Sequence, residues 1–341
     1  MPFIEQQAQT ALKKALLVIE RHQPSLSPAV EPHLEILLRD RTTHPDQRSS
    51  WLGGSLNSLG TPVEFTFSSL DSAVRYVVEV GSPSVLPSQR LAHCLKLLKE
   101  VNASLETIDA CKALVQTFQH FQGKTALDWG AWLGVRHHPS RTDYKIYVQV
   151  KSPYSQALQN WIFPYLEDFP LESHRWQLQA IGQVLASNQR EFYFDLKAST
   201  FDEQTLSAIL QPVSAQTQAT PLLNLMRAVR SKSGSASFPQ TTYGFSYAFS
   251  PGERQPIISI FATSDGYIGS DMFVRQHVLS AAAQHKWDFS AYAECTTPIA
   301  RDLFSTHFHN VLGFLLLPNG KLGFHVSLSP VFAVPGVRRY P

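Results

Sequence analysis

The feature that most constrains the fold is a pair of short, alternating strands that recurs five times along the chain. The first pair lies in residues 60–83 and reads GTPVEFTFSSLDSAVRYVVEVGSP. Apolar and polar residues alternate there, and a period of two places the two sets on opposite faces of a strand. The polar face carries Glu64, Arg75 and Glu79. A solvated surface hairpin would explain one such pair, but five pairs need a common architecture.

Amphipathic helical stretches precede the strand pairs, so the chain repeats a helix, helix, strand, strand unit. Isolated hairpins are marginally stable and expose unpaired edges, whereas closing ten antiparallel strands into a barrel removes every edge. The sequence therefore predicts an α+β fold: a single barrel domain over residues 1–341 with an outer ring of helices. We expect hairpins near 61–80, 126–151, 174–197, 241–262 and 310–329, and helices near 28–39, 88–101, 104–121, 154–165, 202–210, 221–230, 271–287 and 298–308.

In such a barrel the apolar strand faces meet the helices and the polar faces point into a solvent-filled lumen, which ten strands are wide enough to enclose. Several cations in an enclosed space need an anion, and arginine with lysine around a pocket is typical of a phosphate-type site. Neighbouring aromatic rings can stabilise a carbocation. Internal salt bridges in a structural lumen remain the alternative. The residues expected inside are Glu64, Arg75, Glu79, Lys145, Tyr147, Tyr193, Lys197, His325 and Ser327.

The composition excludes several classes of protein. The chain has 341 residues, 16% of them charged, with a net charge of +2 and no basic run that would indicate nucleic-acid binding. Its apolar runs are far shorter than a membrane span, and the N-terminus lacks a secretory pattern. An odd number of cysteines without short spacings predicts free thiols and a cytoplasmic protein. They are Cys94, Cys111 and Cys295.

Three strand motifs resemble those of the aromatic prenyltransferases of the dimethylallyltryptophan-synthase type, the indole prenyltransferases, whose ABBA barrel consists of ααββ units. GTPVEFTFSS followed by VRYVVEVGSP resembles the family's first hairpin. The Lys-x-Tyr of DYKIYVQV resembles its second diphosphate-binding strand, and HVSLSP its closing strand. The resemblance spans residues 60–330 in order and spacing, and the chain length is typical of a compact bacterial, for instance cyanobacterial, member.

The resemblance implies roles for individual residues. Glu64 would accept the indole N–H, Arg75 and Lys145 would grip a diphosphate, and Tyr147 with Tyr193 would form the aromatic shield. The third cationic strand departs from the family's Lys-x-Tyr and reads Tyr193-Phe194-Asp195-Leu196-Lys197, which leaves Lys197 as the candidate for a third diphosphate ligand. The family's late arginine has no clear match. Trp132 and His325 are candidates for the acceptor pocket.

The implied activity is transfer of a dimethylallyl group from dimethylallyl diphosphate to an indole-containing small molecule, such as an indole alkaloid or tryptophan derivative, by Friedel-Crafts-type alkylation. No Asp-Asp-x-x-Asp run is present, so the resemblance implies that magnesium is dispensable and that no cofactor is required. The expected partners are the indole and the allylic diphosphate, without nucleic acid or membrane. The sequence determines neither the acceptor, the carbon attacked nor the oligomeric state.

Two other functions fit parts of the pattern. The barrel can be a non-catalytic carrier of a hydrophobic anionic small molecule, which turnover of an allylic diphosphate would distinguish. A metal enzyme can use His307, His309 and His325, because residues i and i+2 of a strand share a face. No nearby carboxylate or cysteine completes that metal site.

Overall fold

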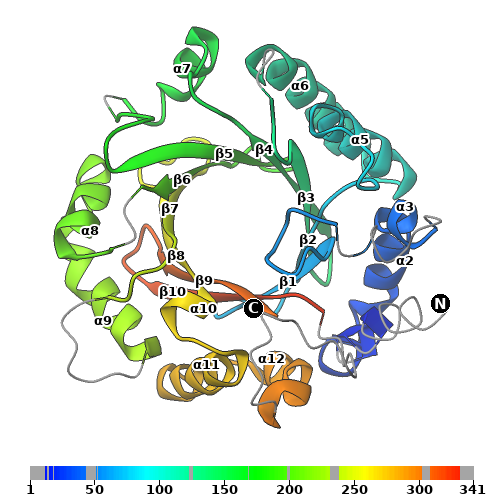
Figure 1. The fold of residues 1–341 in the computed structure, drawn as a ribbon. Coiled ribbons are helices and arrows are strands. Elements are labelled where there is room, and N and C mark those ends of the chain that lie inside the picture. Colours follow the sequence, from blue (N-terminus) through cyan, green and yellow to red (C-terminus); the bar gives the residue numbers. More distant parts are fainter. Residues whose placement is uncertain are drawn as a thin grey trace.

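A computed structural model describes residues 12–13, 15–17, 19–43, 51, 53–122, 126–167, 169–197, 200–230, 238–301 and 308–330 of the chain. Its ten strands form one closed antiparallel barrel in the order β1-β10-β9-β8-β7-β6-β5-β4-β3-β2 (Figure 1). The predicted barrel is therefore confirmed. The strands are β1 Val63–Ser68, β2 Val74–Val78, β3 Ala131–His137, β4 Thr142–Gln149, β5 Trp176–Val184, β6 Arg190–Leu196, β7 Tyr243–Phe249, β8 Ile257–Thr263, β9 His309–Leu316 and β10 Leu322–Leu328.

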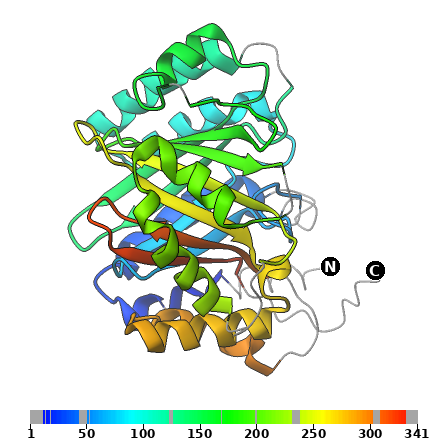
Figure 2. The same ribbon diagram turned by 90° about the vertical axis from the view of Figure 1, so that its left-hand side faces the viewer.

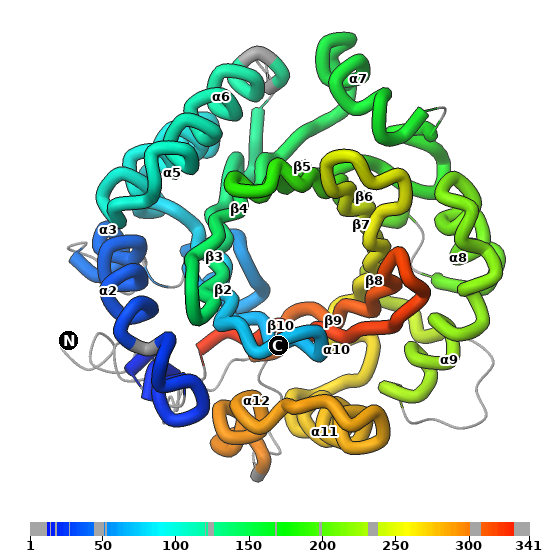
Figure 3. The backbone as a smooth tube through the Cα atoms, turned by 180° about the vertical axis from the view of Figure 1, so that it is seen from behind, coloured from blue at the N-terminus to red at the C-terminus, as the bar shows by residue number. Residues whose placement is uncertain are grey.

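Helices form a ring outside the barrel, which is visible from both ends (Figures 1 and 3). The side view shows α8 and α9 crossing in front of tilted strands (Figure 2). No described helix combines the length and the apolar composition that a membrane span requires. The helices are α2 Ser27–Leu37, α3 Arg39–Thr42, α5 Pro87–Glu100, α6 Leu105–Gln122, α7 Gln156–Ile162, α8 Glu203–Leu210, α9 Ala219–Arg230, α10 Ser264–Tyr267, α11 Asp271–His285 and α12 Ser290–Cys295.

The core lies between the barrel wall and the helices. Burial alternates along the strands, so that in β4 Tyr144, Ile146 and Val148 are buried whereas Lys145 and Tyr147 keep partial exposure. The same alternation runs through β6 and β8. Apolar faces thus pack outward against helices, and the partly accessible polar faces point inward, as the sequence predicts.

The two ends of the barrel differ. The five hairpin turns, at residues 69–73, 138–141, 185–189, 250–256 and 317–321, lie at one end, which we call the hairpin end. The longer connections that contain helices leave from the opposite end, which we call the helix end. Each position along a strand can therefore be assigned to one end of the barrel.

Two expectations differ from the structure. Glu79, expected on the inward face, forms ion pairs with Arg41 of α3 and Arg90 of α5. It lies beyond the end of β2, where the pleat no longer determines the direction of a side chain. In the range 298–308, where the sequence predicts a helix, residues 298–301 belong to a 3₁₀ turn that spans Thr297–Arg301, and residues 302–307 lie outside the described ranges.

Gly130, just before β3, is predicted to be essential for docking α5 against the barrel. Its φ is +73°, and a Cβ atom there would lie 1.8 Å from the carbonyl oxygen of Pro87. We expect Gly130→Ala to lower the free energy of unfolding by about 3 kcal/mol or more, from a left-handed backbone plus a backbone clash. Denaturant unfolding measures this loss.

Gly252 provides the matched control. Its φ is +81°, but nothing lies within 4 Å of the position that a Cβ atom would take there. Gly252→Ala should therefore lower the free energy of unfolding by only about 1–2 kcal/mol, the cost of a left-handed backbone conformation for alanine. Equal losses in the two variants would contradict the docking role of Gly130.

Candidate functional site

Two arginines face each other on the inward side of the barrel wall near the hairpin end. Arg75 of β2 and Arg136 of β3 occupy directly paired positions. Like charges at such positions are destabilising unless an anion lies between them. Burial, and then the charge of Arg136, lowers the pKa of Arg75 below its ordinary value. This arrangement favours binding of an anionic ligand.

The protein compensates this pair incompletely. Arg75 forms an ion pair with Asp71 in the β1–β2 turn and donates a hydrogen bond to the carbonyl of Ala73 at 3.3 Å. Arg136 forms no ion pair or hydrogen bond within the part of the chain that the structure describes, and its residue is exposed. One guanidinium is thus available to an incoming anion.

Lys145 of β4 lies on the same inward surface, under two tyrosine rings. Its Nζ atom is 4.9 Å from the ring centre of Tyr147 and 5.3 Å from that of Tyr193. It donates a hydrogen bond to the Tyr193 hydroxyl at 2.8 Å and pairs with Glu191 of β6. Burial acts to lower the pKa of Lys145, but Glu191 and Tyr147 outweigh it, so the pKa is raised and the amine stays charged.

Lys197 does not join this cluster, contrary to expectation. It follows the last residue of β6, at the helix end, and its Nζ lies 3.0 Å from Glu172 with 37% of the side chain exposed. Each strand residue advances the chain by about 3.3 Å, so six residues along β6 separate Lys197 from Glu191 by roughly 20 Å. The side chains that β6 brings to Lys145 are therefore the carboxylate of Glu191 and the hydroxyl of Tyr193, rather than a further cation.

Glu64 lies deeper in the barrel, on β1 toward the helix end. It is 7% exposed and accepts a hydrogen bond from Asn310 Nδ2 at 2.8 Å. Burial raises its pKa to about 7, although hydrogen bonds from Ser327 and Asn310 act in the opposite direction. Arg75 has Asp71 as its partner, so Glu64 is not the counter-ion of that arginine. A carboxyl group whose pKa lies near 7 is suited to accepting a hydrogen bond or a proton at neutral pH.

Trp132 and His325 lie on different parts of the wall. Trp132 of β3 is paired with Tyr147 and stacks on Trp129 with ring centres 3.9 Å apart. His325 of β10 lies beside the arginines: burial, followed by Arg75 and Arg136, lowers its pKa to about 3. His325 is therefore an uncharged ring beside Arg75 and Arg136. Trp132 instead lies beside the rings of Trp129 and Tyr147.

The histidines proposed for a metal site have other partners. The Nδ1 atom of His309 lies 2.6 Å from Asp271, and its Nε2 atom lies 2.9 Å from the Tyr292 hydroxyl. His307 lies outside the described residues. Within the described ranges, no group of three or more His, Cys, Asp or Glu residues is placed to hold a metal ion.

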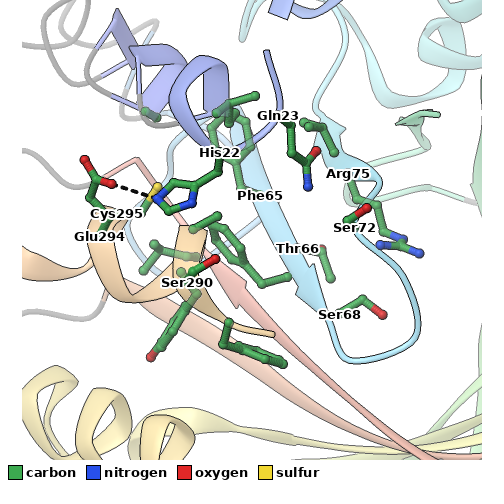
Figure 4. A pocket seen from close by; sticks show the side chains of 18 of the residues that line it. His22, Gln23, Phe65, Thr66, Ser68, Ser72, Arg75, Ser290, Glu294 and Cys295 are labelled. Carbon is green, nitrogen blue, oxygen red and sulfur yellow. Dashed lines mark hydrogen bonds and ion pairs between the residues drawn. The ribbon is translucent and has the colours of Figure 1, made fainter. Parts of the chain in front are cut away.

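A separate pocket of about 860 Å³ lies along β1 and the β1–β2 turn, between the residues that precede α2 and the helix α12 (Figure 4). His22 and Glu294, 2.7 Å apart, lie at one side, and Arg75 lies at the other. Lys145, Tyr147 and Tyr193 are absent from its lining. The chemistry-bearing residues are instead gathered on the inward wall.

Sequence reasoning missed two residues of the site, Arg136 and Glu191. Alternation alone places Arg136 on one of two faces, and only the register across the turn at 138–141 shows that it shares a face with Lys145. The position of Glu191 near Lys145 also follows only from strand register. Glu191 is paired with Gly182 of β5, and the side chain of Lys145 passes over that glycine, because an added Cβ there would lie 2.5 Å from Lys145 Cε. The register of adjacent strands was the missing signal.

The raised pKa of Glu64 predicts a pH-dependent stability. The folded pKa of about 7 exceeds the ordinary 4.5, so the folded state holds this proton more tightly, and the resulting stability is lost as pH rises from 4.5 through 7. Glu64→Gln removes this loss. Relative to the wild type, the free energy of unfolding of the variant should increase by about 2–3 kcal/mol between pH 5 and 8.

Urea unfolding at several pH values measures this trend. Glu191→Gln is the control, because Lys145 and Ser246 outweigh burial and lower the pKa of Glu191, so its titration lies below this window. Glu191→Gln should lower the free energy of unfolding, but its difference from the wild type should not change in favour of the variant between pH 5 and 8. A flat difference for Glu64→Gln would contradict the raised pKa.

Comparison with solved structures supports the fold, whereas comparisons of sequence find no match. No protein-family model matches the sequence, and no curated protein has a significantly similar sequence. Among solved structures, 5-dimethylallyl tryptophan synthase from Streptomyces coelicolor, in complex with DMASPP and Trp, superposes with a TM-score of 0.71 at 13% identity, covering 96% of this chain and 98% of that one. A 6-dimethylallyl tryptophan synthase gives 0.69 at 17% identity, with 94% and 95% covered. AnaPT from Neosartorya fischeri gives 0.62 at 12% identity, with 98% and 96% covered. The chain thus has the barrel fold of the dimethylallyltryptophan-synthase-like prenyltransferases along almost its whole length.

Proposed function

We propose that this protein is an aromatic prenyltransferase that moves a dimethylallyl group from dimethylallyl diphosphate to an indole-containing small molecule. The observation that carries the proposal is the facing pair Arg75 and Arg136 beside Lys145, under the rings of Tyr147 and Tyr193. Cations for a diphosphate and π-faces for an allylic cation lie on one inward wall. Two similarly folded structures support this reading, since one is a complex with DMASPP and Trp and the other, PriB, is a complex with product diphosphate.

The first step is ionisation of the allylic C–O bond. Its electron pair leaves with pyrophosphate, whose developing charge Arg75, Arg136 and Lys145 stabilise. The rings of Tyr147 and Tyr193, 5.7 Å apart, stabilise the allylic cation and exclude water from it. In the free protein Glu191 compensates Lys145, so the diphosphate competes with this carboxylate for the amine.

The second step forms the new C–C bond. Ionised Glu64 accepts a hydrogen bond from the indole N–H and raises the electron density of the ring, which attacks the allylic cation. The carbon attacked then transfers its proton to Glu64 or to the released pyrophosphate, which restores aromaticity. Trp132 and His325 are proposed contacts of the acceptor. Because Glu64 must be ionised and its pKa is about 7, turnover should rise with pH through neutrality.

Side-chain cations, in this proposal, supply the charge that a metal ion supplies in other isoprenyl enzymes. We therefore propose that magnesium is dispensable, which unchanged turnover in EDTA would support. A cytoplasmic location, where allylic diphosphates and reduced thiols are both available, belongs to the same proposal.

The direct test incubates the protein with dimethylallyl diphosphate and a panel of indoles, and follows the addition of one prenyl unit by mass spectrometry. A prenylated indole together with released pyrophosphate is the expected result. Binding of the diphosphate without turnover of any indole would favour the non-catalytic carrier instead.

Loss of any one of the inward cations should weaken diphosphate binding. We expect Arg75→Gln, Arg136→Gln and Lys145→Ala each to weaken the binding of a non-hydrolysable allylic diphosphate. The expected loss in binding free energy is about 1.5–3 kcal/mol, the value of a charge-assisted hydrogen bond. Isothermal titration calorimetry measures the change. Lys197→Gln is the control and should leave affinity unchanged, because Lys197 pairs with Glu172 at the helix end. Unchanged affinity in all three test variants would assign these cations a structural role only.

Glu64→Gln tests the acceptor role. Glutamine keeps the size and one accepting oxygen but loses the charge, so turnover of a free indole should fall by roughly 10²–10⁴, the contribution of a positioned acid–base group. Diphosphate affinity should be nearly unchanged. An N-methylindole has no N–H to donate, so the wild type should turn it over slowly, and the variant should turn it over at nearly the same rate as the wild type. Equal turnover of free indole by both proteins would rule out this role.

A further inference from the structure

Asp195 is an inward-facing carboxylate that the proposed chemistry leaves unused. It lies next to the last residue of β6, near the helix end, where it is paired with Gln177 of β5 and Gly244 of β7. The nearest cation along the strand, Lys197, is bound to Glu172 instead. Asp195 therefore forms no ion pair or hydrogen bond among the residues that the structure describes.

The surroundings of Asp195 agree with this lack of a partner. Burial alone raises its pKa to about 6, with no contribution from a neighbouring charge or hydrogen bond. A half-buried carboxylate is still mostly ionised at neutral pH with this value. An unpaired, partly desolvated charge is costly, and a cationic ligand would relieve that cost.

Aromatic rings flank this carboxylate. Phe261 of β8 lies across Gly244, since a Cβ atom on that glycine would lie 2.2 Å from Phe261 Cε2. The ring is thus held over the position adjacent to Asp195. Tyr193, two residues before Asp195 on the same face, has its ring centre 6.4 Å from that of Phe261. A carboxylate beside π-faces is a typical binding site for an ammonium group.

Charge is also segregated along the barrel. The inward-facing cations of the ten strands are Arg75, Arg136 and Lys145, at the hairpin end or mid-strand. Of the inward-facing carboxylates on the ten strands, Glu64 of β1 and Asp195 of β6 lie nearest the helix end. These two strands are five positions apart in the ring, on opposite walls. An acceptor that donates its indole N–H to Glu64 can extend across the barrel to Asp195.

We propose that Asp195, with the rings of Phe261 and Tyr193, binds the protonated amine of the aromatic acceptor, and that this acceptor is an amine without a free carboxylate. The inference rests on the proposed function, because it assigns the second anchor of the same acceptor. An amino acid would bring its carboxylate close to Asp195, where the strands offer no inward cation to balance it. Recognition at this end therefore selects for positive charge.

Binding of three probes to the free protein tests the proposal without requiring turnover. We expect tryptamine to bind more tightly than the neutral 3-ethylindole, and L-tryptophan to bind more weakly than tryptamine. Asp195→Asn should weaken the binding of tryptamine by about 10-fold or more, which corresponds to the loss of one charge-assisted bond, and should leave the binding of 3-ethylindole unchanged. Phe261→Leu, which keeps the carboxylate, should weaken tryptamine by about 3-fold or more through loss of a cation–π contact.

The controls separate the possible failures. Lys197→Gln should leave all three affinities unchanged, and the tryptamine preference of the wild type should vanish below about pH 6, where Asp195 becomes protonated. If Asp195→Asn lowers affinity or turnover equally for tryptamine and 3-ethylindole, amine recognition is overturned. If the wild type prefers tryptamine through Asp195 but prenylates no indole, the amine site stands and the proposed transferase activity fails.

Discussion

The pairing of β1 with β10 is the contact on which the rest of the structure depends. It joins the first and the last strand of the described chain, with Phe65 opposite Leu328 and Thr66 opposite Ser327. Without it, the sheet would keep two exposed edges and the polar faces would open to bulk water. Closure also brings Asn310 and Ser327 to Glu64, and these contacts hold its carboxyl group in place.

Closure turns the inward faces of ten strands into one enclosed surface with an uneven distribution of charge. Arginines lie at directly paired positions near the hairpin end, and Asp71 forms an ion pair with one of them, Arg75. Carboxylates with raised pKa values lie toward the helix end. Because electrostatic interactions strengthen away from bulk water, this separation would orient the two substrates of the proposed reaction, with the anion toward the hairpins and the aromatic acceptor toward the helices.

Sequence reasoning recovered part of the candidate site. Glu64, Arg75 and Lys145 were found because each lies inside a strand with clear alternation, where direction follows from the pleat. Glu79 and Lys197 were misplaced because both lie just past the end of a strand, where an outer helix or a neighbouring loop carboxylate determines their direction. Arg136, Glu191 and Asp195 were overlooked because their importance depends on neighbours in adjacent strands.

Local pattern by itself determined the ten strands, the apolar faces that meet the helices and the prediction of a closed barrel, because period-two alternation is a property of consecutive residues. Only the tertiary structure decided which inward residues meet. Lys145 pairs with Glu191, forty-six residues away, and Arg75 faces Arg136 through a register set by β2 and β3. Such pairings depend on strand register and closure, and a shift of two residues would preserve every alternating pattern while exchanging every partner.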